Sequence, residues 1–576
     1  MRGSNYDKFP CTVVDGKIAI GWKDITNKLK EEAYPHKTVC IDLYVGTHEE
    51  EIVSAFNGFD GRKLILTKDL MKSETEVKAM TDGLLTDDVL FGHRTYLSMT
   101  DYFPKGTIEK TKSSINGSDG KWIIIGCGAS LFMDDAALLV YADMARWEIQ
   151  LRIRRKEIQA LGLDNRLEAT SVQQKRGYFN DWLICDKHKD SIIRKVDYWL
   201  DTNKKDCPKM ISSETFMKGI DKTAAAPFRV VPFFDPAPWG GQWMKDVCDL
   251  DRSAPNYGWC FDCVPEENSL LLKVDGTLFE IPSQDLILLK SRDVLGEPVE
   301  SRFGKDFPIR FDFLDTIRGG NLSLQVHPTT QFVKENFGLN YTQDESYYLL
   351  DCDENACVYL GLKPNVDKTE MINALEESQN KGKNFDAEKY VNKFKAKKHD
   401  HYLIPGGTIH CSGSGSMVLE ISSTPNIYTF KLWDWNRMGL DGKPRPINIE
   451  RGKNVIDWER DTEYVHKHLA NHIEVVSEGD GWKEEKTGLH PNEFIETRRH
   501  WFTKTVTHRT DNSVNVLNLI EGEEALVESP DNEFEPFVVH YAETFIVPAV
   551  VGSYTIRPFG RSVGKKCGTI KASVRF

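Results

Sequence analysis

Three short segments of this 576-residue chain combine strand-like alternation with side chains that can bind a metal ion. In the first, Leu322 to His327, successive side chains alternate between the two faces of a strand, so Gln325 and His327 share one face. Pro328 ends this strand because it has no backbone N–H to give to a sheet. The pattern predicts a strand of a β-barrel that directs an amide and an imidazole inward.

Two later segments offer ligands to the same interior. Glu345 opens an apolar run, and His410 follows the tight turn at Pro405-Gly-Gly407. One amide, two imidazoles and one carboxylate suit Zn²⁺ and leave room for water or a substrate oxygen. The prediction rests on the four occurring together, because a single histidine on a strand is more often structural. His401 is an alternative ligand, but its charged surroundings predict a solvent-facing position.

The same segments, in the same order, resemble class I mannose-6-phosphate isomerases over about residues 226 to 576. The motifs that carry the resemblance are Pro238-Trp-Gly-Gly241, Phe307 to Asp315, Gln325-Val-His-Pro328, Glu345, Pro405 to His410, and Tyr428 to Arg437. The resemblance implies a cupin that uses zinc to interconvert mannose 6-phosphate and fructose 6-phosphate through a cis-enediol. By position, it implies Gln325, His327, Glu345 and His410 as metal ligands and Lys431 and Arg437 as catalytic groups.

The chain also departs from this family at three positions. Asp312 and Gln343 stand where the family usually has lysine, and Lys431 replaces an arginine, which keeps the charge but loses the planar fork. A phosphorylated sugar carries nearly two negative charges, so the loss of cations should weaken its binding or change the substrate. The alternative function is therefore a regulatory cupin that binds metal and sugar phosphate without turnover.

Four cations remain that could replace the missing lysines. They are Arg318, Lys431, Arg437 and Arg445. For Arg318 and Arg445 an ordinary surface position is the more common outcome for such residues.

Composition excludes several classes of protein. The formal charge of −13 argues against nucleic acid as the main partner, and the resemblance implies a small-molecule sugar phosphate as ligand. Twelve cysteines are too few for a disulfide scaffold, and Cys260 and Cys263 form the single Cys-x-x-Cys pair, so we expect reduced thiols in the cytoplasm. No apolar run is long enough to cross or associate with a membrane. The oligomeric state has no signal in the sequence.

The first 222 residues have a different pattern, in which short apolar runs alternate with helix-length polar stretches. The runs predict a parallel sheet in an α/β domain; they are Lys37 to Val45, Arg62 to Thr67, Lys121 to Ile125 and Ala137 to Tyr141. Amphipathic helices are predicted from Ala142 to Leu161 and from Ser191 to Leu200.

This domain is similar to P-loop nucleoside and nucleotide kinases around Leu139 to Asp143 and Lys175 to Lys189. It has no Gly-Lys-Ser/Thr motif, and Gly126 to Ser130 is predicted to be a plain strand-to-helix turn rather than a phosphate cradle. A bifunctional protein with an N-terminal phosphotransferase is thus a third possibility, carried by fold analogy alone.

The predicted architecture has three domains. An α/β domain at 1–222 precedes a metal-binding cupin at 223–470, which carries a charged helical insert at 368–398. A smaller cupin at 471–576 repeats the turn Phe545-Ile-Val-Pro-Ala549 without a histidine at the metal position, so no metal is expected there.

Overall fold

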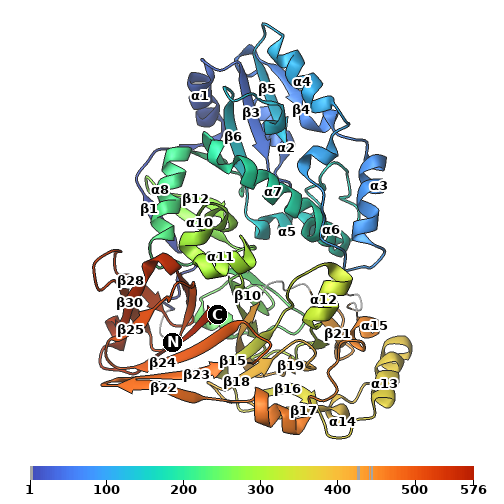
Figure 1. Ribbon diagram of the computed structural model, residues 1–576, viewed down its shortest axis with the longest axis vertical. Helices are drawn as coiled ribbons and strands as arrows, with labels where there is room; N and C mark the ends of the chain where they lie inside the picture. Colours follow the sequence, from blue (N-terminus) through green and yellow to red (C-terminus); the bar gives the residue numbers. More distant parts are fainter. Residues whose placement is uncertain (1–3, 424–427, 440–441, 443–444, 446, 489) are drawn as a thin grey trace. The chain divides into compact units, whose positions relative to one another are not determined.

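The protein folds into two compact units (Figure 1). The computed structural model describes all residues except 1–3, 424–427, 440–441, 443–444, 446 and 489. The N-terminal unit consists of Cys11–Thr223 and Glu266–Lys290, and the β unit of Met1–Pro10, Ala224–Pro265 and Ser291–Phe576. No helix in the described part of the chain is both long and apolar enough to cross a bilayer.

A seven-stranded sheet forms the centre of the N-terminal unit. Its order is β2-β8-β7-β6-β3-β5-β4, and the five strands from β7 to β4 are parallel. The parallel strands are β3 (Thr38–Leu43), β4 (Lys63–Leu66), β5 (Trp122–Gly126), β6 (Leu138–Asp143) and β7 (Tyr198–Asp201). β2 (Ile18–Ile20) and β8 (Lys209–Ser212) are antiparallel and close one edge. The predicted parallel sheet is confirmed.

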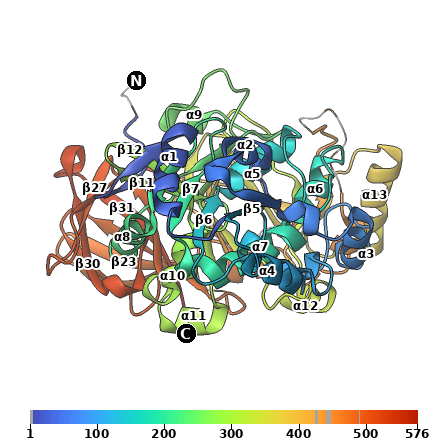
Figure 2. The same cartoon turned by 90° about the horizontal axis from the view of Figure 1, so that it is seen from above.

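Every residue of β3 is buried, as expected for a central parallel strand with helices on both faces of its sheet. Val39 and Ile41 pack against α1 (Gly21–Ala33) and α2 (Glu49–Ala55) on one face. On the other face Asp42 contacts His188 of α7 (Trp182–Ile192). Figure 2 shows α1 and α2 on one side of the strands and α7 on the opposite side.

The second segment of this unit, Glu266–Lys290, comes from the part of the sequence assigned to the metal-binding cupin. Its hairpin, β11 (Ser269–Val274) and β12 (Thr277–Pro282), pairs in parallel with β1 (Cys11–Val14). The buried amine of Lys189 lies 2.6 Å from Asp285 and 2.9 Å from Asp143. The observed division therefore differs from the predicted boundary at 222, since the chain crosses between the units more than once.

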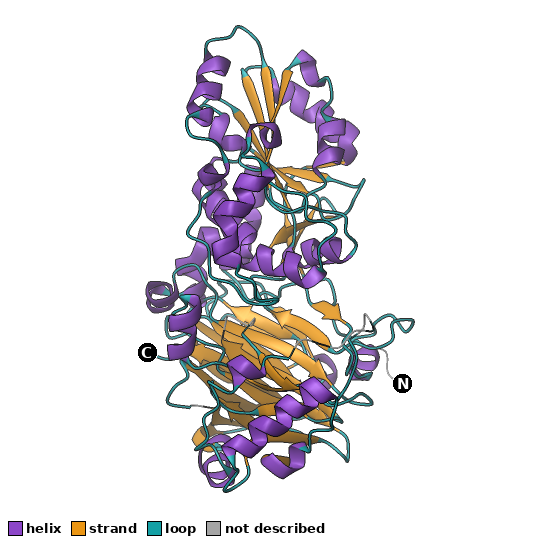
Figure 3. Cartoon of the chain, turned by 90° about the vertical axis from the view of Figure 1, so that its right-hand side faces the viewer, coloured by secondary structure: helices purple, strands orange, loops and turns teal. Residues whose placement is uncertain are grey.

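Two pairs of antiparallel sheets make up the β unit, and Figure 3 shows their strands as stacked layers. In the first pair, a six-stranded sheet has the order β18-β15-β20-β13-β10-β9 and a five-stranded sheet the order β17-β16-β19-β14-β21. The strands of the first sheet are β9 (Phe233–Asp235), β10 (Trp259–Cys263), β13 (Ile309–Asp315), β15 (Glu345–Cys352), β18 (His401–Ile404) and β20 (Ser416–Ser423). Those of the second are β14 (Leu324–Val326), β16 (Cys357–Leu362), β17 (Val391–Lys395), β19 (His410–Ser412) and β21 (Phe430–Trp433).

The second pair of sheets begins after residue 473. Its orders are β22-β23-β24-β31-β26-β29 and β25-β30-β27-β28. The strands are β22 (Glu474–Gly479), β23 (Trp482–Gly488), β24 (Ile495–Phe502), β25 (Val506–Arg509), β26 (Asn515–Glu521), β27 (Glu524–Glu528), β28 (Phe537–His540), β29 (Thr544–Val547), β30 (Ser553–Pro558) and β31 (Cys567–Val574). Buried side chains from both sheets, including Leu517, Phe545 and Ile556, form one apolar core.

Two helix predictions need correction. The stretch from Ser191 to Leu200 is not one helix, because α7 ends at Ile192 and β7 begins at Tyr198. The insert at 368–398 contains α13 (Lys368–Lys381) and α14 (Ala387–Tyr390), but Val391–Lys395 is a strand that pairs with β16. Both errors arise at short strands whose partners are distant in sequence. The helix predicted from Ala142 to Leu161 is present but shorter, as α5 (Arg146–Arg154), because β6 runs to Asp143.

Candidate metal centre

Three neighbouring strands of the five-stranded sheet place polar side chains side by side. Gln325 of β14 pairs with His410 of β19 on one side and with Lys431 of β21 on the other. Directly paired residues of antiparallel strands point to the same face, and His327 shares that face because it lies two residues after Gln325. Strand alternation therefore gathers four of the predicted site residues on one face.

The facing sheet supplies the carboxylate. Glu345, the first residue of β15, has Oε1 2.8 Å from His410 Nε2 and Oε2 3.0 Å from His327 Nε2. The amide of Gln325 lies 3.2 Å from His410 Nε2. His327, Glu345 and His410 are buried and form the one cluster among the described residues that could hold a metal ion. The structure thus brings together all four predicted ligands.

The hydrogen bonds of the two imidazoles fit metal binding. Nδ1 of His410 lies 2.8 Å from the carbonyl of Thr408, and Nδ1 of His327 lies 3.2 Å from that of Tyr428. If Nδ1 of each ring carries the proton, the electron pair of Nε2 is available for a metal ion, which is the arrangement found in metal-ligating histidines. His327 Nε2 and Glu345 Oε1 are buried atoms without a hydrogen-bond partner in the described part of the chain.

The distances between these atoms are close to those between ligands of a single zinc ion. Two ligand atoms at about 2.1 Å from a tetrahedral zinc ion lie roughly 3.4 Å apart. The observed separations of 2.8 to 3.2 Å are close to this value. An amide flip would turn the oxygen of Gln325 toward the centre, since its O and N have nearly the same shape.

His401, the alternative ligand, lies outside the cluster. It is buried rather than exposed to solvent, so the solvent-facing prediction was wrong. His401 pairs with Tyr348 of β15, three residues from Glu345, and therefore points to the opposite face of the sheet. Burial, together with the charge of Arg499, lowers the pKa of His401 to about 3. The ring is a neutral core residue.

Sequence reasoning missed part of the wall opposite the histidines. Glu420 of β20 pairs with Asp312 of β13 and with Tyr347 of β15, on the same face as Glu345. Burial raises the pKa of Glu420 well above its usual range, and the charges of Glu345 and Asp312 add to this effect. The alternating strand Met417 to Ile421 contained a signal for this residue, because it places one carboxyl among apolar neighbours.

The two positions where lysine is missing are occupied by a different network. The Gln343 amide donates to Glu345 Oε2 at 2.9 Å and to Glu420 Oε1 at 3.4 Å. Asp312 lies 2.9 Å from Arg310, which comes two residues earlier on the same strand and face. The charge of Asp312 is therefore balanced within β13.

The four candidate cations have different surroundings. Arg318 pairs with Asp246 at 2.6 Å and is exposed, so it lies outside the site. Arg437 and Arg445 both pair with Asp434, at 2.6 and 3.1 Å. The side-chain amine of Lys431 makes no hydrogen bond or ion pair with the described residues, and burial, together with the charge of Arg445, lowers its pKa to about 8. Of the four, Lys431 is the cation in the same row as Gln325 and His410.

Comparisons with known proteins give two kinds of match. Residues 21–225 match a family described as "Domain of unknown function (DUF8485)". The chain is also homologous, at low identity, to mannose-6-phosphate isomerases. The Bacillus subtilis protein named "Putative mannose-6-phosphate isomerase YvyI" is 24% identical over 332 residues, which are 58% of this chain and 96% of that protein.

Two further matches have the same description. "Mannose-6-phosphate isomerase ManA" of B. subtilis is 27% identical over 174 residues, or 30% of this chain and 50% of that protein. A crystal structure of the mannose 6-phosphate isomerase from B. subtilis aligns with a TM-score of 0.49 and 21% identity, covering 60% of this chain and 99% of that structure.

Proposed function

We propose that the β unit is a zinc-dependent isomerase that interconverts mannose 6-phosphate and fructose 6-phosphate in the cytoplasm. The observation that carries the proposal is the convergence of Gln325, His327, Glu345 and His410 from two facing sheets. Homology to mannose-6-phosphate isomerases over almost the full length of one relative supports the same reaction. Two imidazoles, a carboxylate and an amide form a donor set that suits Zn²⁺ and leaves space for substrate.

The reaction moves a proton between C1 and C2 of the open-chain sugar through a cis-enediol. A zinc ion held by the four residues would act as a Lewis acid for the sugar oxygens. Lys431 has a pKa of about 8 and is mostly protonated at neutral pH, so its amine can offset negative charge on a phosphate or enediolate oxygen. Arg437 is held by Asp434 and by the carbonyl of Asn321, both at 2.6 Å, and would position this wall of the site.

The regulatory alternative is favoured by one observation. Gln343 places a neutral amide between Glu345 and Glu420, where a lysine would place a positive charge. A site with fewer cations would bind a sugar phosphate less strongly and could have lost turnover.

Metal analysis and a coupled isomerase assay on the same preparation distinguish these functions. We expect about one zinc ion per chain and conversion of mannose 6-phosphate. His410→Ala should lose both, and His401→Ala serves as the matched control because this histidine faces away from the cluster. Binding of mannose 6-phosphate without conversion would select the regulatory function, and a chain without metal would refute both.

A further inference from the structure

The N-terminal unit contains a cavity that the isomerase function does not use. Its volume is about 400 Å³, within the range of small-molecule sites. Residues that follow three parallel strands line it: Tyr44 to Thr47 after β3, Thr67 to Asp69 after β4, and Cys127 after β5. The chain runs from β3 past β5 to β4, and from β5 past β3 to β6. It therefore leaves the neighbouring strands β3 and β5 in opposite directions along the sheet. Open α/β sheets bind ligands at such a point, beyond the carboxyl ends of the strands.

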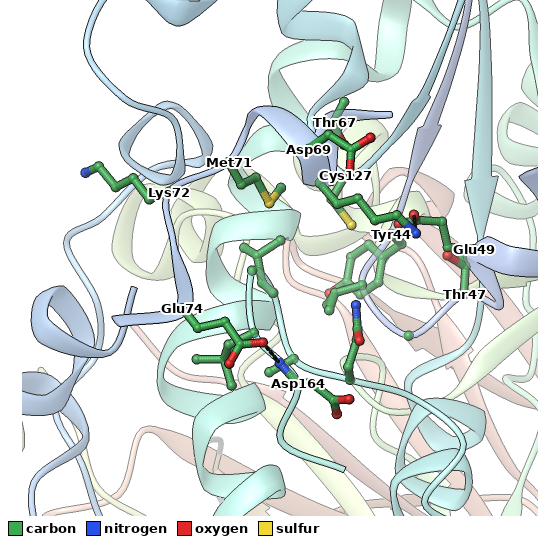
Figure 4. Close-up of a pocket in the computed structure, with 18 of the residues that line it drawn as sticks. Tyr44, Thr47, Glu49, Thr67, Asp69, Met71, Lys72, Glu74, Cys127 and Asp164 are labelled. Atoms are coloured by element: carbon green, nitrogen blue, oxygen red, sulfur yellow. Dashed lines mark hydrogen bonds and ion pairs between the residues drawn. The ribbon is translucent and has the colours of Figure 1, made fainter. Parts of the chain in front are cut away.

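The charges around this cavity are mainly negative. Glu49, Asp69, Glu74 and Asp164 line it together with two lysines. Lys68 lies 2.9 Å from Glu49 and Arg166 lies 2.6 Å from Asp164, which leaves Asp69 and Glu74 without a paired cation among the described residues, and Figure 4 shows the amine of Lys72 pointing away from the other labelled side chains. An anionic ligand would therefore meet carboxylates without an equal number of free cations.

Groups that could bind a phosphate near these strand ends are already engaged within the protein. The backbone amides of Gly128 and Ser130 donate to the buried carboxylate of Asp42 at 3.0 and 2.9 Å. Arg146 pairs with Asp186 at 2.8 Å. An internal carboxylate thus occupies the position that a phosphate would need in the turn from Gly126 to Ser130.

The remaining wall suits a neutral ring with hydroxyl groups. Met71, Leu161 and Leu163 supply an apolar surface, while the carboxylates can accept hydrogen bonds from several hydroxyls. In the described part of the chain, the carboxylates of this cavity do not converge as a metal cluster, so a bound cation does not account for them.

We propose that this cavity binds an uncharged, hydroxyl-rich molecule of the size of a nucleoside or a hexose and discriminates against its phosphate ester. The carboxylates that receive the hydroxyls are the same groups that repel a phosphate. This function differs from that of the β unit, whose proposed substrate is phosphorylated.

Calorimetric titration of the full chain tests the proposal. The probes are the four ribonucleosides, mannose, glucose and fructose, each beside its monophosphate. Because the β unit is proposed to bind hexose phosphates, only the part of the binding that Leu163→Trp removes is counted. Leu163 is buried in the cavity wall, and a larger ring there should fill the space. We expect saturable binding of at least one neutral probe and at least tenfold weaker binding of its phosphate.

A second variant locates the site even if Leu163→Trp does not fold. Asp164 is an exposed residue of the cavity wall, and Asp164→Lys should reduce the preference for the neutral probe by at least threefold. Asp119→Lys makes the same charge change at an exposed position outside the cavity and should leave the preference unchanged. The proposal is overturned if no neutral probe binds, if a phosphate ester binds as tightly as its parent, or if Asp164→Lys behaves like the control.

Discussion

Replacing Glu345 by glutamine tests the metal centre most directly. The substitution keeps the shape of the side chain but removes the one formal negative charge among the four proposed ligands. Both carboxylate oxygens are affected, since one lies 2.8 Å from His410 and the other 3.0 Å from His327. Residues that only support a ligand contribute about 10- to 100-fold to metal affinity, so a direct ligand should contribute at least about 100-fold, or about 2.7 kcal/mol.

The loss of zinc affinity can be measured through the thermal stability of the protein. At a zinc concentration of about 100 times the dissociation constant, binding stabilises the native protein by about 2.7 kcal/mol. If Glu345→Gln weakens binding about 100-fold, the same zinc concentration gives about 0.4 kcal/mol. At about 2 °C per kcal/mol for a large domain, the zinc-induced shift in Tm should fall from about 5 °C to about 1 °C.

The metal-free protein provides the internal check. Glu345 is fully buried beside His327 and His410, so the zinc-induced shift of each variant is measured from the Tm of its own metal-free form. Glu354→Gln, at an exposed position of the same unit, is the matched control and should keep the full zinc-induced shift. A Glu345→Gln variant that keeps the parental shift would refute the ligand assignment.

Three further predictions concern the site and the two units. Lys431→Met should raise the KM for mannose 6-phosphate about tenfold, as expected for a lost hydrogen bond to a charged group, while the zinc content stays unchanged; equal kinetics in parent and variant would remove Lys431 from the site. Burial and the charge of Asp201 raise the pKa of Glu280 to about 7. Because the folded pKa exceeds the unfolded value, stability should decline by at most about 1.4 kcal/mol per pH unit as pH rises from about 4.3 to 7. Glu280→Gln should flatten this slope in denaturant titrations, and an unchanged slope would assign it to other groups. Arg229 is buried 2.8 Å from Glu543, so Arg229→Met should cost about 3–5 kcal/mol of unfolding free energy. Adding Glu543→Gln should recover part of that loss, and a fully additive double variant would contradict the pairing.

The convergence of the four proposed ligands was predictable because it follows from strand alternation. Gln325 and His327 are two residues apart, and the register of β14 with β19 and β21 then adds His410 and Lys431. The parallel sheet was predictable for a similar reason, since strands buried on both faces are continuously apolar.

Other features depend on contacts that the local sequence does not encode. The pairing of β1 with β11 joins segments about 260 residues apart, and the sequence pattern of neither strand identifies its partner. The balance of Asp312 by Arg310 and the burial of His401 likewise depend on which face of a strand meets the core. The cavity of the N-terminal unit was not predicted, because loops after three separate strands build it.

The excursion of the chain through Glu266–Lys290 has a consequence for dissecting the protein. A fragment that stops at residue 222 would lack the strand neighbour of β1 and Asp285, one of the two acidic partners of Lys189, and would expose an unsatisfied sheet edge. A synthetic peptide covering 266–290 should rescue such a fragment by complementation.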